Sequence, residues 1–274
     1  MLAALIIVFR EVFEAGLIVG IVLAVTRGVP QRGLWVAGGV AGGVLGACIV
    51  AAFAGVLSEA FAGSGQELFN ATVLLIAVVM LTWHNVWMAR HGRELAAEMR
   101  AAGEAVVSGR SSLAALAIVV GVATLREGAE VVLFLYGILA SGGTSEASVF
   151  LGGVLGLALG ALVCALAYFG LLRIPGRHLF AVTSAMIAFL AAGMAAQAVH
   201  FLAQADVLTA LGAVVWDTSW LLSDGSVVGK ALHTLVGYND RPTAMELSVY
   251  IATLLVMFAL MRLFAPEPKA VPAH

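Results

Sequence analysis

The stretch Arg10-Glu11-Val12-Phe13-Glu14 places three ionisable residues inside an apolar run that extends from Leu2 to Val25. A second copy, Arg126-Glu127-Gly128-Ala129-Glu130, lies inside the apolar run from Leu113 to Ala140. A charged side chain in the middle of a membrane-spanning helix costs roughly 2.5–3.5 kcal/mol on insertion scales. Six lone charges would together cost more than the usual stability of a domain, which is about 5–15 kcal/mol. The six side chains must therefore face one another, water or a cation.

The composition is that of a membrane protein. Of the 274 residues, 62% are hydrophobic and 11% are charged, and the mean hydropathy is +1.06. Soluble domains are nearer 45–50% apolar and about 25% charged. The net charge of −2 gives no basic surface for nucleic acid. Cys48 and Cys164 both lie in apolar runs and form no CxxC pair, so we interpret them as packing residues.

Stretches long enough to span a bilayer define the fold class. A spanning helix needs about 20 predominantly apolar residues. The sequence predicts an all-α polytopic membrane protein with seven transmembrane helices, at residues 2–26, 34–57, 67–89, 113–140, 148–172, 179–203 and 246–264. The second and fifth stretches are rich in glycine, which lets helix backbones approach closely in a bilayer. We expect these two helices to pack in the centre of the bundle.

The distribution of Lys and Arg predicts the orientation of the chain. Ten of these residues fall in the segments on one side of the membrane, whereas the other side has only Lys230 and Arg241. Loops rich in Lys and Arg stay in the cytoplasm. We therefore expect the N-terminus outside, the C-terminus in the cytoplasm, and a multi-pass location in the inner (plasma) membrane.

An internal repeat relates the two charged motifs. An offset of 116 residues takes each charged residue of the first motif to its counterpart in the second, Cys48 to Cys164, and His84 to His200. Each copy contains three predicted spans, an odd number, so the two copies have opposite orientations. The prediction is two inverted three-helix repeats plus a seventh helix, an architecture typical of transporters.

The chain divides along this pattern. The predicted units are a first three-helix repeat (1–89), a cytoplasmic linker helix (90–112) and a second, inverted three-helix repeat (113–203). An extracytoplasmic loop with interfacial helices (204–245), a seventh transmembrane helix (246–264) and a disordered tail (265–274) follow.

The glutamates of the two motifs suit a metal cation. Glu11 and Glu14 share one helix face, as do Glu127 and Glu130. The four carboxylates and the two arginines leave a charge of −2, which a hard cation would balance. We predict a metal site of Glu11, Glu14, Glu127 and Glu130, supported by Arg10 and Arg126. The alternative is a pair of structural salt bridges. A di-metal enzyme is disfavoured, because such sites use Glu-x-x-His motifs that both clusters lack.

Other polar residues are candidates for the path of the cation. His84, His200 and Gln197 lie in predicted spans, where they either line a pathway or are hydrogen-bonded packing residues. In the external loop, Asp217, Asp224 and His233 could attract cations to the mouth of the pathway. Solvation and helix capping are the alternative roles for these three residues.

The paired motifs resemble those of the high-affinity iron permease family, the oxidase-dependent iron transporters. The contexts Phe9-Arg10-Glu11-Val12-Phe13-Glu14-Ala15-Gly16 and Leu125-Arg126-Glu127-Gly128-Ala129-Glu130 are similar to its bacterial branch, as is Thr82-Trp83-His84-Asn85-Val86-Trp87-Met88. The likeness covers roughly residues 1–264. It implies that the four glutamates bind iron and that the arginines accompany them.

The resemblance implies an iron permease rather than an enzyme. Iron would be the transported substrate, with Fe³⁺ favoured over Fe²⁺, and no cofactor is expected. The expected partners are the iron ion, the lipid bilayer, and a ferroxidase or periplasmic iron-delivery protein, but no nucleic acid. The alternative function is proton-coupled transport of another divalent metal, Mn²⁺ or Pb²⁺, by the same carboxylates.

Overall fold

The computed structural model describes residues 1–60, 66–141, 144–170 and 176–264. These residues form helices and no β-strand, apart from an isolated antiparallel bridge between Val214 and Thr243. The fold is therefore all-α, as predicted. The helices are α1 (Leu2–Val25), α2 (Arg32–Ala60), α3 (Gln66–Val107), α4 (Leu113–Ala140), α5 (Glu146–Tyr168), α6 (Gly176–Gln204), α7 (Val227–Val236) and α8 (Ala244–Leu263).

Five of the described helices are long and apolar enough to cross a membrane: α2, α5, α8, and the portions Gln66–Met88 of α3 and Val182–Gln204 of α6. The chain is thus a multi-pass membrane protein. Helices α1 and α4 have comparable lengths, but each carries three ionisable residues in its middle. The position of α1 and α4 in the bundle therefore has to explain how these ionisable side chains are accommodated.

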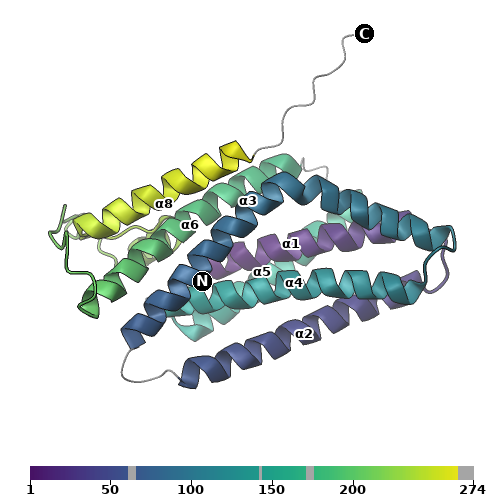
Figure 1. The fold of residues 1–274 in the computed structure, drawn as a ribbon, viewed down its shortest axis with the longest axis horizontal. Coiled ribbons are helices and arrows are strands. Elements are labelled where there is room, and N and C mark those ends of the chain that lie inside the picture. The colour runs from purple at the N-terminus through teal and green to yellow at the C-terminus, as the bar shows by residue number, and fades with distance from the viewer. Residues whose placement is uncertain (61–65, 142–143, 171–175, 265–274) are drawn as a thin grey trace, which may run out of the picture.

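The helices pack in pairs around α1 and α4. Helix α1 lies along α5, α4 lies along α2, and α3 crosses α6, which also carries α8 (Figure 1). The start of α1 packs against the end of α4, and the end of α1 packs against the start of α4. The two charged motifs therefore lie on antiparallel helices.

The glycine-rich helices α2 and α5 lie at the edge of the bundle, so the prediction that they occupy its centre is wrong. Their outer faces expose Ile49 (71%) and Phe150 (74%). The close approach of backbones is confirmed, because a Cβ on Gly39 would lie 2.4 Å from the carbonyl oxygen of Ala117 on α4. A Cβ on Gly156 would lie 2.5 Å from the carbonyl oxygen of Leu5 on α1. Each glycine face packs against a motif-bearing helix and leaves the opposite face uncovered.

Helix α3 is longer than its predicted span. It continues to Val107, so the residues after 89 extend α3 rather than forming a separate linker helix. No proline interrupts it, and Leu95 and Met99 pack against α1 and α4. Figure 1 shows α3 bending part-way along its length. Just past the end of the apolar span, the imidazole of His91 binds the carbonyl oxygen of Trp87 at 3.2 Å.

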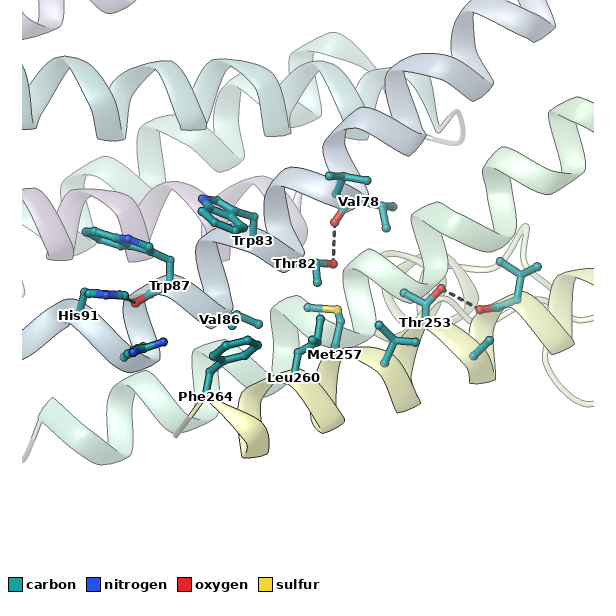
Figure 2. A pocket seen from close by; sticks show the side chains of 15 residues that line it. Val78, Thr82, Trp83, Val86, Trp87, His91, Thr253, Met257, Leu260 and Phe264 are labelled. Carbon is teal, nitrogen blue, oxygen red and sulfur yellow. Dashed lines mark hydrogen bonds between the residues drawn. The ribbon is translucent and has the colours of Figure 1, made fainter. Parts of the chain in front are cut away.

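A groove runs between α3 and α8. Its volume is about 640 Å³, and its walls are mostly apolar side chains. Trp87 and His91 lie side by side at one end of it, with ring centroids 5.0 Å apart (Figure 2). The groove thus reaches the part of α3 where the apolar span gives way to the polar extension.

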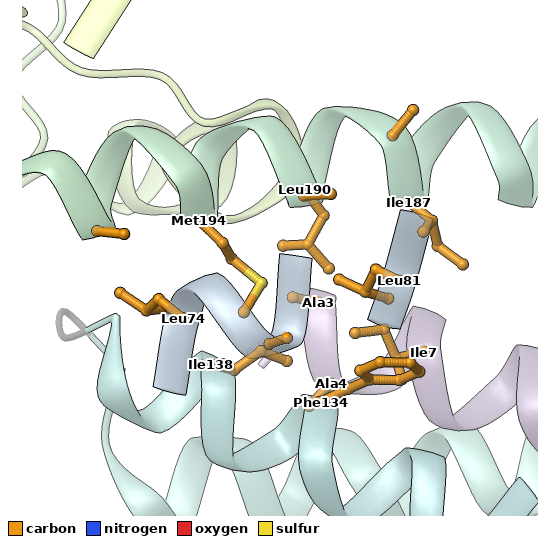
Figure 3. Packing of buried hydrophobic residues seen from close by; sticks show 14 of the residues in the cluster. Ala3, Ala4, Ile7, Leu74, Leu81, Phe134, Ile138, Ile187, Leu190 and Met194 are labelled. Atoms are coloured by element: carbon orange, nitrogen blue, oxygen red, sulfur yellow. The ribbon is translucent and has the colours of Figure 1, made fainter. Parts of the chain in front are cut away.

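Two clusters of buried apolar side chains form the core. The first apolar cluster joins α1, α3, α4 and α6 (Figure 3) and includes Ala3, Ala4, Ile7, Leu74, Leu81, Phe134, Ile138, Ile187 and Met194. The second apolar cluster consists of Ile18, Val22, Val36, Met99, Leu116 and Val120. On α1 and α4, both charged motifs lie between these two clusters.

The segment between α6 and α8 contains one helix among the described residues, α7, where interfacial helices were expected. The side chain of Ser226 caps its N-terminus, and Gly237 ends it with a left-handed backbone conformation (φ 67°). Thr243 and Glu246 form a capping box at the start of α8. The predicted disordered tail, residues 265–274, lies outside the described residues.

Candidate metal centre

Helix α1 contributes a fully buried ion-pair network. The guanidinium of Arg10 lies 2.9 Å from Glu11 Oε1 and 2.9 Å from Glu14 Oε1. All three side chains are at most 2% exposed. The i, i+4 spacing places Arg10 and Glu14 on one side of the helix, and the long side chain of Arg10 also reaches Glu11. The network fixes one oxygen of each carboxylate and leaves the other oxygen of each free to face α3 and α4.

Helix α3 contributes His84, which lies between the two motifs. Its Nδ1 is bonded to Glu130 Oε2 on α4. Its Nε2 lies 3.5 Å from Glu14 Oε2 and 3.7 Å from Glu11 Oε2 on α1. His84 is 4% exposed. The imidazole therefore bridges α1 and α4 inside the bundle. We call Glu11, Glu14, His84, Glu127 and Glu130 the carboxylate–histidine cluster.

Four members of the cluster converge closely enough to hold one metal ion. Glu11, His84, Glu127 and Glu130 each offer a ligand atom, and these atoms all lie within 4.8 Å of one another. Among the described residues, Glu11 Oε2 and Glu127 Oε2 are buried without a hydrogen-bond partner. Such carboxylate oxygens are unfavourable in an apolar interior unless a cation or a proton offsets them. Salt bridges within each helix therefore account for only part of the cluster.

The two arginines occupy different environments. Arg126 Nε lies 3.2 Å from Glu130 Oε1 but 3.9 Å from Glu127 Oε1. Its guanidinium is 4.3 Å from the centroid of the Trp87 ring. The side chain of Arg126 is 36% exposed, compared with 2% for Arg10. The motif on α1 is thus sealed, while the motif on α4 is open on one side.

The chemistry of the cluster suits a divalent metal of the first transition row. With His84 neutral, the four carboxylates of the cluster and the guanidinium groups of Arg10 and Arg126 beside it sum to −2. Carboxylate oxygens favour hard cations such as Mn²⁺, and imidazole extends the range to iron and zinc. The donor set includes neither thiolate nor thioether. The cluster therefore matches iron or manganese better than copper(I).

The remaining predicted site residues lie away from the cluster. His200 Nδ1 donates to Glu246 Oε1 at 2.7 Å, which ties α6 to α8. Gln197 and His233 line a cavity of about 20 Å³ beside Ala3 and Ile138, which is room for one water molecule.

In the loop, Asp217 pairs with Arg241 at 3.1 Å and is 51% exposed. Hydrogen bonds from Ser219, and then Arg241, hold the pKa of Asp217 below its ordinary value. The side chain of Asp224 accepts from the backbone N–H of Asp240, and Asp240 accepts from that of Asp224. Both acids thus have partners within the loop, and a role for them at the mouth of the pathway stays a prediction.

Sequence reasoning missed three features. The sequence left His84 as a pathway-lining or a packing residue, and the structure places it among the glutamates. Glu246 is 5% exposed and was not singled out, although Thr243-x-x-Glu246 is a capping-box pattern. The contact of Trp87 with Arg126 had no signal in the sequence, because it joins two helices about 40 residues apart.

A multi-pass helix bundle that buries carboxylates and an imidazole between antiparallel helices has the architecture of a membrane carrier for a metal cation. The chain belongs to the Iron permease FTR1 family, which matches residues 1–266.

Curated relatives agree with this family. The chain is 32% identical over 269 residues to the ferrous iron permease EfeU of Shigella sonnei (strain Ss046), covering 95% of this chain and 96% of the relative. It is also 32% identical over 270 residues to the ferrous iron permease EfeU of Yersinia pestis, covering 97% and 94%. No solved structure matches the chain.

Proposed function

We propose that this chain carries iron across the membrane into the cytoplasm by way of the carboxylate–histidine cluster. The observation that carries the proposal is the convergence of Glu11, His84, Glu127 and Glu130. These residues come from three helices and two symmetry-related motifs, and their free oxygens face one another. A cation between them would offset their charge, whereas the arginine salt bridges leave Glu11 Oε2 and Glu127 Oε2 without a hydrogen-bond partner.

We propose Fe²⁺ as the first candidate for the transported ion, in place of the Fe³⁺ favoured from the sequence. With His84 neutral, the four glutamates and the two arginines beside them sum to −2, which a divalent ion balances. The imidazole of His84 is a softer ligand than a carboxylate, which favours Fe²⁺ over Fe³⁺. The curated relatives are named as ferrous iron permeases. Mn²⁺ would satisfy the same charge, so it serves as the competing ion in the test.

We further propose seven spans with an inverted repeat, in the inner membrane, with the N-terminus outside. Support comes from the packing, in which α1 with α5 and α4 with α2 are the pairs that an offset of 116 residues exchanges. In this orientation the first apolar cluster lies on the external side of the carboxylate–histidine cluster. A ferroxidase or periplasmic iron-delivery protein would supply the ion at that side.

The test is uptake of radiolabelled iron by liposomes that contain the purified protein. Fe²⁺ under reducing conditions, Fe³⁺ with a weak chelator, and Mn²⁺ are supplied separately, with and without an imposed pH gradient. Fe²⁺ uptake that Glu127→Gln abolishes is the expected result. Glu67→Gln is the matched control, because Glu67 lies in the first turn of α3, away from the cluster.

The outcomes separate the candidates. Uptake of Fe³⁺ alone would show that Fe³⁺, the ion favoured from the sequence, is the substrate. Uptake of Mn²⁺ in preference to both forms of iron would replace iron as the substrate. Full iron uptake by folded Glu127→Gln would remove the cluster from the pathway.

A further inference from the structure

The two arginines occupy equivalent positions in the repeat and lie on opposite sides of the glutamates. Arg10 precedes Glu11 and Glu14 on α1, and Arg126 precedes Glu127 and Glu130 on α4. Because α1 and α4 are antiparallel, Arg10 lies toward the first apolar cluster and Arg126 lies toward the second. Each arginine therefore stands at one approach to the metal-binding groups.

The two approaches differ in the structure. Arg10 binds both glutamates of its motif at 2.9 Å and is 2% exposed. Arg126 approaches Glu130 at 3.2 Å, leaves Glu127 at 3.9 Å, and is 36% exposed. Glu130, at 13%, is also more exposed than Glu14, its repeat counterpart, at 2%. One approach is closed, and the other is open.

Trp87 accounts for the position of Arg126. The guanidinium lies 4.3 Å from the centroid of the Trp87 ring, within the range of a cation–π interaction. This contact draws Arg126 away from Glu127 and toward α3. Among the described residues, no cation–π contact of this kind is found for Arg10. Its guanidinium pairs with Glu11 and Glu14 of its own motif.

A continuous line of contacts leads away from the cluster on this side. From Arg126 it passes to Trp87, then to His91, whose ring centroid is 5.0 Å from that of Trp87. His91 Nε2 lies 3.9 Å from Glu94, which is 70% exposed. The line follows α3 beyond the end of its apolar span at Met88.

We propose that Arg126 is the movable gate on the cytoplasmic side of the carboxylate–histidine cluster, and that Trp87 is the positioning residue that holds this gate open. The metal ion then leaves along α3, past Trp87 and His91. The identity of the ion rests on the proposed function, but the gate does not. An exposed guanidinium in hydrocarbon is costly, so the open side of Arg126 faces water.

The gate closes when Arg126 leaves Trp87 and binds Glu127 and Glu130 together, as Arg10 binds Glu11 and Glu14. In that state the positive charge lies between the glutamates and the cytoplasm and blocks the exit of a cation. Opening at the opposite approach then requires the converse movement of Arg10.

The experiment uses an arginine-selective, membrane-impermeant reagent, p-hydroxyphenylglyoxal, on sealed vesicles of each orientation, without iron. Peptide mass spectrometry compares modification at Arg10 and Arg126 in the unsubstituted chain. Arg241, which is 59% exposed in the external loop, and Arg100, which is exposed on the extension of α3, report the two sides. We expect Arg126 to be modified from the side that modifies Arg100, and Arg10 from neither side.

Variants then test the role of Trp87. In Trp87→Leu, modification of Arg126 should fall about tenfold, because the arginine closes onto its glutamates. Trp87→Phe keeps an aromatic face and should retain most of the modification. Trp83→Leu is the matched control, one turn away on α3 and 71% exposed. In liposomes, the uptake rate of Trp87→Leu should fall about tenfold.

Three results would overturn the gate: equal modification of Arg10 and Arg126, modification of Arg126 from the side that modifies Arg241, or unchanged modification in Trp87→Leu. If the expected pattern appears in a chain that transports no iron, the gate stands and the proposed function fails. If the chain takes up iron but shows any of these three results, the proposed function stands and the gate is rejected.

Discussion

The imidazole of His84 on α3 bonds through Nδ1 to Glu130 on α4, while its Nε2 faces Glu14 on α1 at a distance of 3.5 Å. One side chain therefore contacts both motifs. Any ion held by both motifs also meets His84, and loss of the ion changes the contacts of three helices at once.

Replacement of His84 by Ala is expected to weaken iron binding by at least about tenfold, because the cluster loses its nitrogen ligand and the link between α1 and α4. Equilibrium binding of iron to the purified protein in detergent measures this. His200→Ala is the matched control from the other repeat, since His200 bonds Glu246 instead. Equal binding by both variants would exclude His84 as a ligand.

The two arginines are expected to differ in their effect on stability. Arg10→Met leaves Glu11 and Glu14 buried without their partner, and breaking a buried pair costs about 3–5 kcal/mol. Arg126→Met removes a partly exposed pair, which contributes about 0–1 kcal/mol. Thermal unfolding of the purified variants, followed by circular dichroism, compares them. A similar loss of stability in both would contradict the difference in burial.

Gly39→Ala is expected to destabilise the packing of α2 on α4 by about 1–3 kcal/mol, because the added methyl group would meet the backbone of Ala117. Gly38→Ala is a neighbouring control, since a Cβ there has no atom within 4 Å. Alanine favours a helix over glycine, so Gly38→Ala should be neutral or stabilising. Thermal unfolding that gave the reverse order would reject the close contact between these two helices.

The stability of the loop between α6 and α8 is expected to depend on pH through Asp224. Burial raises the pKa of Asp224, and the nearby carboxylate of Asp240 raises it too, although the backbone N–H of Asp240 acts in the opposite direction. A carboxyl group with a raised pKa in the folded chain opposes folding when it ionises, so the penalty grows as the pH rises through that pKa.

Asp224→Asn removes this charge and keeps an oxygen acceptor for Asp240. The variant should raise the melting temperature by no more than about 2 °C near pH 8. It should have no effect at about pH 3, below the ordinary aspartate value of about 3.9. Thermal scans at the two pH values measure the difference. A variant that is less stable near pH 8 would show that the ionised carboxylate is favourable.

The sequence was sufficient to predict the helical fold and the meeting of the two motifs. Ionisable residues in apolar runs must face one another, water or a cation. The offset of 116 residues indicated that Glu11 and Glu127 occupy equivalent positions in the two repeats. Hydropathy, however, contains no information on which face of a helix meets which neighbour. The glycines of α2 and α5 were therefore assigned to the centre, although they pack against one partner each.

The other features that the sequence did not predict depend on contacts between side chains far apart in the chain. The place of His84 depends on the angle at which α3 crosses α1 and α4, and the contact between Trp87 and Arg126 depends on the same angle. Neither follows from periodicity along the chain. The extension of α3 past Met88 was also missed, because its polar surface suggested a separate element, while Leu95 and Met99 anchor it to the bundle.

The position of the charged layer between one closed approach and one open approach has an electrical consequence. Where the approach at Arg126 is open to water, the transmembrane voltage falls mainly across the first apolar cluster, so an ion that reaches the layer from that side has crossed most of the field. Each elementary charge moved through 100 mV gains about 2.3 kcal/mol. A divalent cation drawn toward a negative cytoplasm therefore gains about 4.6 kcal/mol over the whole path at that voltage. The membrane potential alone would therefore favour the inward movement of a cation that the proposed function requires.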